Sequence, residues 1–295
     1  MFQKRTDLAL EARELWTESA QKALPGVRSK TRRDEGYPVT RVDVLDERGA
    51  QALGKPVGRY LTVDLRAYAS RREGFFDRAV RVVGRQLRPL LPEKGPLLVL
   101  GLGNRRMTPD AIGPLSLQHL LVTRHLISAL PEHFGDFRGV AALAPGVLGD
   151  TGVETAEAAA ALCAQLRPAA VIVIDALAAR RMERLCATVQ LSDTGIIPGS
   201  GVGNHRQALN RETLGVPVLS IGIPTVVDAA TIAADLLEQQ GILDIDPERL
   251  RQGEAFFVTP KDIDIQVRDL AKVVGYAISW AVQGLEIQEI TALLS

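Results

Sequence analysis

Apolar runs and helical periodicities alternate along this chain and predict an α/β fold. Residues 97–100 and 171–174 are Leu, Val or Ile at every position, and 216–223 is a third, mostly apolar run. Such runs are typical of parallel strands that are buried on both faces. Apolar residues at helical spacing predict helices over 6–24, 75–91, 154–167, 226–239 and 261–282, and one that follows Gly113-Pro114 and ends near Leu130.

Shorter apolar or alternating stretches predict four further strands, at 39–45, 59–65, 139–143 and 185–191. The first two flank a turn at Gly54-Lys55-Pro56, and we expect them to pair antiparallel at an edge of the sheet. No low-complexity linker divides the 295 residues. The order of elements therefore predicts a single three-layer α/β domain with a mostly parallel twisted sheet.

Two aspartates follow buried strands of this predicted sheet. The stretch Leu97–Pro114 leads from an apolar strand through a Gly-rich turn into a loop that carries Asp110, and the run 171–174 ends directly in Asp175. Because the carboxyl ends of parallel strands meet at one edge, we expect the two acids to lie close together. Two adjacent carboxylates cannot both ionise, so one could polarise a carbonyl while the other activates water.

Other interpretations of this region stay open on pattern alone. The Gly-rich motif of a dinucleotide-binding site needs a third glycine, and Arg106 stands at that position. The Gly-x-Ser-x-Gly motif of a serine hydrolase does not occur, and Gly199-Ser200-Gly201 is only superficially similar to it. A metal site could use Asp110, Asp175 and His205, although no His or Cys pair has metal-ligand spacing. Either aspartate could also simply cap a helix or turn.

Charge and composition narrow the classes of partner. Thirty-five basic and 35 acidic residues give a net charge of zero, which disfavours direct binding of nucleic acid or of a membrane surface. The two cysteines are typical of reduced core residues, and no apolar run is long enough for a membrane helix. We therefore expect a soluble cytoplasmic protein.

Six motifs follow one another along the chain: Thr108–Pro114, Ala144–Val147, Ile174–Ala178, Leu191–Gly195, Pro198–Asn204 and Ile223–Asp228. In this order they resemble the motifs of the germination protease of spore-forming bacteria. The resemblance implies an aspartic-type endopeptidase, without cofactor or metal, that degrades small acid-soluble spore proteins in the spore core during germination. It also implies a homotetramer, a fold similar to hydrogenase-maturation peptidases, and Asp110 and Asp175 as the catalytic pair.

The same resemblance implies a zymogen that cuts itself near its start. Thr6-Asp7-Leu8-Ala9-Leu10-Glu11 is similar to the family's substrate pattern, with Asp7 in place of Glu, so cleavage is expected between Asp7 and Leu8. Residues 1–7 would then be a short propeptide and 8–295 the protease domain. Thr6 or Asp7 could equally cap the first helix.

Groups that could support the substrate or an oxyanion lie near the predicted strand ends. They are Asn104, the backbone N–H groups of Gly201 and Gly203, and His205, with Arg105, Arg106, Arg180 and Arg181 as candidate cations. The alternatives to the aspartic-type protease are a metal-dependent maturation-type endopeptidase on the same fold and a non-catalytic binder of spore proteins.

Overall fold

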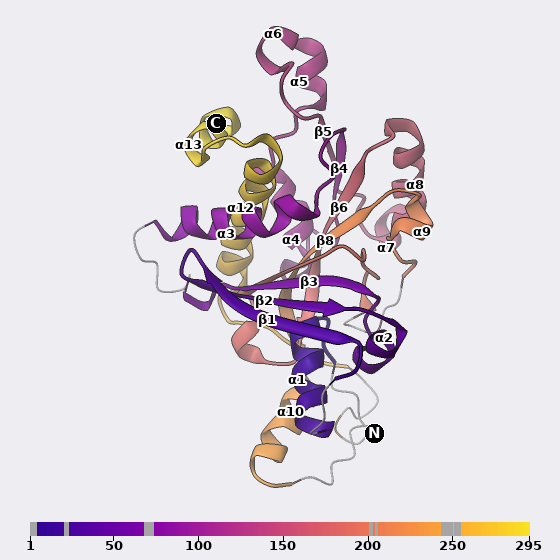
Figure 1. Ribbon diagram of the computed structural model, residues 1–295, viewed down its shortest axis with the longest axis vertical. Coiled ribbons are helices and arrows are strands. Elements are labelled where there is room, and N and C mark those ends of the chain that lie inside the picture. Colours follow the sequence, from indigo (N-terminus) through magenta and orange to yellow (C-terminus); the bar gives the residue numbers. More distant parts are fainter. Residues whose placement is uncertain are drawn as a thin grey trace.

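The computed structural model describes residues 5–20, 24–67, 74–200, 203, 206–242, 250 and 255–295. Its nine described strands form one sheet in the order β1-β2-β3-β7-β8-β6-β4-β5, with β9 paired to β8 (Figure 1). The strands are β1 Val27–Asp34, β2 Tyr37–Val44, β3 Gly58–Asp64, β4 Leu97–Gly101, β5 Val140–Leu143, β6 Ala170–Ala179, β7 Thr188–Ser192, β8 Val218–Asp228 and β9 Phe257–Val258.

Helices cover both faces of this sheet, which makes the α/β fold three-layered (Figure 1). The α-helices are α1 Ala9–Ala20, α2 Glu47–Leu53, α3 Phe75–Leu87, α4 Ile112–Ser116, α5 Arg124–Ala129, α6 Pro131–Phe134, α7 Leu148–Thr151, α8 Thr155–Leu166, α9 Arg211–Leu214, α10 Ala229–Gln239, α12 Ile263–Gln283 and α13 Ile287–Leu294. Short 3-10 turns are η2 Arg88–Leu90, η3 Thr108–Asp110, η4 Leu117–His119 and η5 Met182–Arg184.

Alternate residues of the central strands fill two separate cores. Leu97 and Val99 of β4 pack on the face covered by α3 and α12, and Leu98 and Leu100 pack on the opposite face against α8. Period-two alternation of side chains in a strand produces this division. Burial on both faces is why the sequence of β4 is apolar throughout.

The sheet is more mixed than the mostly parallel arrangement expected from the sequence. Strands β5, β4, β6 and β8 are parallel neighbours, whereas β8-β7, β7-β3, β3-β2 and β2-β1 are antiparallel pairs. The α/β class is confirmed. Strands β2 and β3 pair antiparallel as predicted, but they do not form the edge, because β1 lies outside them.

The other differences from the sequence-based prediction have local causes. Strand β1 reads VRSKTRRD, and its mostly exposed polar residues carry no apolar alternation, so it was missed. The long helix predicted after Gly113-Pro114 is broken into α4, η4 and α5. Near the break, Leu121 N–H donates to Ser279 Oγ on α12, and Thr123 N–H donates to the Val140 carbonyl on β5. These tertiary hydrogen bonds interrupt the helix, although the apolar residues continue at helical spacing.

Among the described residues, no helix combines the length and the apolar character that crossing a bilayer would require.

Candidate active site

The loop that follows β4 is held tightly against the sheet by glycines. A Cβ built on Gly113 of α4 would lie 2.2 Å from the Leu102 carbonyl oxygen and 2.7 Å from that of Ile174 on β6. A Cβ on Gly101 would lie 2.5 Å from the Gly113 carbonyl oxygen. Only glycine allows this approach of α4 to the carboxyl ends of β4 and β6, which brings η3 and Asp110 to β6.

Asp110 is fixed by the turn that precedes it. The Asn104 backbone N–H donates to Asp110 Oδ2 at 2.7 Å. Gly103 has a φ of 107°, and a Cβ there would lie 1.9 Å from the Asp110 carbonyl oxygen. The glycine turn therefore wraps around the aspartate and aims an N–H group at its carboxylate.

Asp175 lies within β6, where the neighbouring strand β4 stops. Strand β4 pairs with β6 only as far as Ile174, whereas β6 continues to Ala179 beside β8. The prediction that the strand ends at Asp175 is therefore wrong, although Asp175 is the first residue of β6 beyond the end of β4. Its side chain is buried, and the Ala176 N–H donates to Asp175 Oδ1 at 2.9 Å.

The two carboxyl groups interact. Burial raises the pKa of Asp175 well above its ordinary value, and the negative charge of Asp110 raises it further, followed by that of Asp7. Burial also raises the pKa of Asp110, while the hydrogen bond from Asn104 opposes that rise. One of two such groups retains a proton at a pH where an isolated aspartate is ionised.

The N-terminal segment lies along the edge of β6 that β4 leaves open. Asp7 N–H donates to the Ala178 carbonyl oxygen at 2.9 Å, and Ala178 N–H donates back to Asp7 Oδ2 at 2.8 Å. Leu8 and Ala9 are fully buried. The charge of Asp7 acts on Asp175, so the Asp7–Leu8 bond, the one predicted for cleavage, lies near that buried aspartate.

Gln190, a buried residue of β7, contacts the backbone on both sides of that bond. Its Nε2 donates to the Asp7 carbonyl oxygen at 3.2 Å, and its Oε1 accepts from Ala9 N–H at 2.8 Å. Gln190 was not among the residues predicted from the sequence. Its one distinguishing feature there is a polar amide side chain within the stretch 185–191, whose strand β7 is buried at every position.

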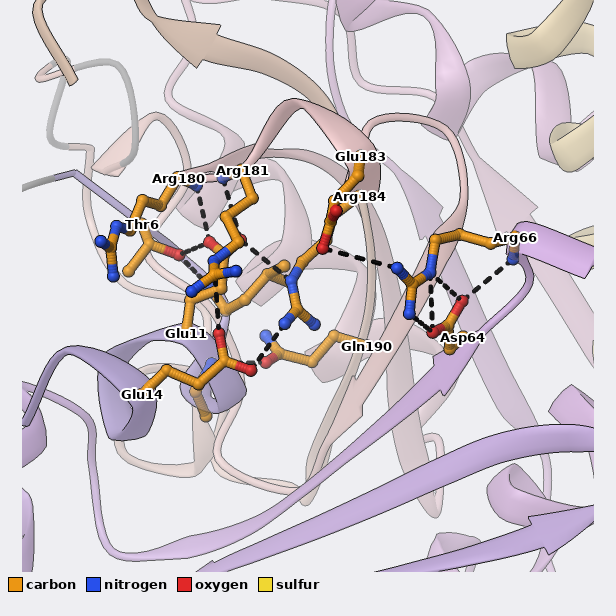
Figure 2. A network of polar contacts seen from close by, with 12 residues as sticks. Thr6, Glu11, Glu14, Asp64, Arg66, Arg180, Arg181, Glu183, Arg184 and Gln190 are labelled. Atoms are coloured by element: carbon orange, nitrogen blue, oxygen red, sulfur yellow. Dashed lines mark hydrogen bonds and ion pairs between the residues drawn. The ribbon is translucent and has the colours of Figure 1, made fainter. Parts of the chain in front are cut away.

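Buried Glu11 secures the start of α1 to the loop after β6 (Figure 2). Its carboxylate accepts from the N–H groups of Arg180 and Arg181 at 2.6 and 3.1 Å and from Thr6 Oγ1 at 2.5 Å. Arg184 Nε forms an ion pair with Glu11 Oε1 at 3.2 Å. Burial raises the pKa of Glu11, and these hydrogen bonds and the Arg184 charge oppose that rise.

The arginines of the loop after β6 are already engaged with carboxylates. Arg180 forms ion pairs with Glu18 and Asp235, and Arg181 pairs with Glu18 and Glu14. Neither is therefore available as a free cation for a substrate. Arg105 and Arg106 instead line a cleft of about 380 Å³ beside Asn104, together with Gly146 and Asp150.

The remaining residues predicted to support a substrate or an oxyanion have different surroundings in the structure. Asn104 acts through its backbone N–H on Asp110, and its side-chain Oδ1 accepts from Arg106 N–H. Gly203 lies near the Arg5 guanidinium group, since a Cβ there would be 3.3 Å from Arg5 Nη2. Gly201 and His205 lie outside the described residues. Within the described part of the chain, no group of three or more His, Cys, Asp or Glu could hold a metal ion.

Comparison with known proteins gives matches along most of the chain. The germination protease family profile matches residues 5–241. The chain is similar to germination proteases of Caldanaerobacter subterraneus, at 43% identity over 98% of both chains, and of Clostridium perfringens, at 42% identity over 96% of both. A Bacillus cereus germination protease is 44% identical over 80% of this chain and 66% of its own length.

Among solved structures, a [NiFe] hydrogenase maturation protease, HycI from Thermococcus kodakarensis, matches 65% of this chain and 98% of its own. Its TM-score is 0.34 and its sequence identity 15%, so the likeness is weak.

Proposed function

Because the chain belongs to the germination protease family, we propose that it is an endopeptidase that starts the degradation of small acid-soluble spore proteins, with Asp110 and Asp175 as its catalytic acid pair. The observation that carries the mechanism is the position of Asp110 on η3 against β6, next to the buried Asp175 just beyond the end of β4. The charge of Asp110 accordingly raises the pKa of Asp175. In such a pair one carboxyl group keeps its proton and can donate it, while the other is ionised and can accept one. Peptide hydrolysis by a carboxyl pair requires both. The proposal includes a homotetramer that acts in the spore core.

The proton is assigned by the surroundings of each acid. Asp175 is more buried and has the negative charges of Asp110 and Asp7 beside it, so Asp175 is the protonated partner and hydrogen-bonds the scissile carbonyl. Asp110 accepts an N–H hydrogen bond from Asn104, which favours its ionised form, and it takes a proton from the attacking water.

Water and the two carboxyl groups supply every proton that the proposed reaction needs. The water oxygen bonds to the carbonyl carbon while the carbonyl oxygen receives the proton of Asp175. The tetrahedral intermediate collapses with cleavage of the C–N bond, the proton on Asp110 passes to the departing amine, and a hydroxyl proton returns to Asp175. Gln190 Nε2, which donates to the Asp7 carbonyl oxygen in the intact chain, would polarise that carbonyl group as a second donor beside Asp175.

The first bond cut is proposed to be the chain's own Asp7–Leu8 bond. In the intact chain, residues 6–9 lie along β6 and Gln190, where a substrate would have to bind. Cleavage would free residues 1–7 and open that edge. Support for self-processing comes from the nearness of this segment to Asp175, whose pKa responds to the charge of Asp7.

Substitution of either acid tests the proposal. Asp110→Asn and Asp175→Asn keep the shape of the side chain but remove the exchangeable proton, so each should slow self-cleavage and peptide cleavage by about a hundredfold or more. Asp136→Asn, at an exposed position distant in sequence, is the matched control and should cleave normally. Unchanged cleavage in folded Asp110→Asn or Asp175→Asn protein would remove that residue from the mechanism.

A further inference from the structure

We propose that Ala178 N–H, Ser200 Oγ and the Lys55 ammonium group form the subsite that selects an acidic residue on the amino side of the scissile bond. This inference rests on the proposed function, because it treats residues 6–9 as a substrate bound in its own site. Each of the three groups belongs to a different part of the fold: β6, the loop after β7, and the loop between α2 and β3.

The first observation is that both carboxylate oxygens of Asp7 are bound. Ala178 N–H donates to Oδ2 at 2.8 Å, and Ser200 Oγ donates to Oδ1 at 3.0 Å. Hydrogen bonds to an ionised acceptor are stronger than those between neutral groups. Two donors directed at two separate oxygens match a carboxylate, whereas an amide side chain would present its NH₂ group to one of them.

The second observation is a nearby positive charge. Lys55 Nζ donates to the Thr6 carbonyl oxygen at 3.4 Å, and the charges of Asp7 and Glu11 both act on its ammonium group. Burial lowers the pKa of Lys55, and these two acids oppose that lowering. A half-buried lysine bound to the carbonyl group next to Asp7 favours an acidic residue at position 7 over a neutral one of equal size, because the added negative charge offsets the desolvation of the ammonium group.

The third observation is a backbone hydrogen bond that a separate peptide could also make. The Ala178 carbonyl oxygen accepts from Asp7 N–H at the edge of β6 that β4 leaves free. An extended peptide can make this bond with an exposed strand edge whatever its sequence. The Ala178 carbonyl therefore supplies sequence-independent binding, and Ala178 N–H, Ser200 and Lys55 supply the preference for an acidic residue.

A double-mutant cycle on self-cleavage tests this subsite in the full-length chain. The four proteins are the unaltered chain, Lys55→Met, Asp7→Asn and the double variant, and the measured quantity is the rate of loss of residues 1–7. If Lys55 reads the charge of Asp7, Lys55→Met should slow cleavage about tenfold in the unaltered chain. It should have little effect when residue 7 is already Asn, so the two substitutions should be non-additive.

Controls separate this role from a structural one. Lys30→Met, at an exposed position of β1, should leave the rate unchanged, and Lys55→Arg should retain most of it because the charge is kept. Ser200→Ala in place of Lys55→Met should give the same non-additivity. Equal slowing by Lys55→Met in both backgrounds, with Ser200→Ala also additive, would overturn the subsite. No cleavage of the unaltered chain would contradict the proposed function instead.

Discussion

At the scale of single residues, the proposed acid pair depends on the burial of the Asp175 carboxyl group. The sequence predicted that Asp110 and Asp175 would lie together, because the strand-end rule for parallel sheets needs only the two apolar runs. It could not predict Gln190, Lys55 or Ser200 beside Asp7. These contacts join positions 7 and 190, 6 and 55, and 7 and 200, and no local pattern in the sequence encodes pairs so far apart.

The buried acid should make stability depend on pH. Burial and the Asp110 charge raise the folded-state pKa of Asp175 above its unfolded value of about 3.9, so between these two pKa values the folded chain binds the extra proton. Stability therefore falls as pH rises through that window. Asp175→Asn cannot ionise, so its melting temperature relative to the unaltered chain should be higher at pH 8 than at pH 4. A difference that does not vary with pH would contradict the raised pKa.

The pH dependence of cleavage should report the same pair. The reactive form carries one proton, so the rate should fall at low pH as Asp110 protonates and at high pH as Asp175 ionises, giving a bell-shaped profile. The Asp7 charge raises the pKa of Asp175, so Asp7→Asn should move the alkaline limb of the self-cleavage profile to lower pH. An alkaline limb at the same pH in both proteins would show that Asp7 and Asp175 do not interact.

At the scale of elements, α4 and α1 hold the site from two sides. Helix α4 positions Asp110 through close glycine contacts, and α1 follows directly on the segment that covers the edge of β6. Strands β4, β6 and β8 and helices α3, α8 and α12 were predictable, because burial on one or two faces leaves a clear apolar pattern. Strand β1 was not predictable, because it lies at the sheet edge and its residues are mostly polar. The break after α4 was not predictable either, because tertiary hydrogen bonds cause it.

Gly113 should tolerate no side chain. A Cβ would lie 2.2 Å from one backbone carbonyl oxygen and 2.7 Å from another, so Gly113→Ala must push α4 away from β4 and β6. We expect a loss of about 1–3 kcal/mol in the free energy of unfolding, with a large fall in cleavage as Asp110 shifts. Gly149→Ala is the control, since nothing lies within 4 Å of its Cβ position. Equal denaturation midpoints for the two variants would contradict this packing.

Glu11 should be essential for holding α1 in place. Glu11→Ala leaves the backbone N–H groups of Arg180 and Arg181 without their acceptor and Arg184 without its buried partner, so a loss of about 3 kcal/mol is expected. Hydrogen exchange should show faster exchange in α1 and at Asp7. Glu212→Ala, at an exposed position of α9, should change neither quantity. Protection of α1 that survives Glu11→Ala would show that Glu11 does not hold this helix.

At the scale of the whole molecule, one sheet carries both the acid pair and the segment proposed as its first substrate. The parallel half supplies Asp175, and the antiparallel half supplies Gln190 through β7. The N-terminal segment contacts both halves. The Asp7 carboxylate accepts a hydrogen bond from β6, and the Asp7 carbonyl and the Ala9 N–H are hydrogen-bonded to Gln190. Removal of residues 1–7 would therefore free the edge of β6 and Gln190 Nε2 together, which would link the proposed self-processing to activity.

We propose that Asp110 and Asp175 together cut the Asp7–Leu8 bond. The most direct measurement is the N-terminal residue of the purified full-length chain and of its Asp175→Asn variant after incubation at mildly acid pH. We expect Leu8 as the new N-terminus of the unaltered chain and an unchanged N-terminus in the variant. A new N-terminus at Leu8 in both proteins, or cleavage of the unaltered chain at a different bond, would contradict it.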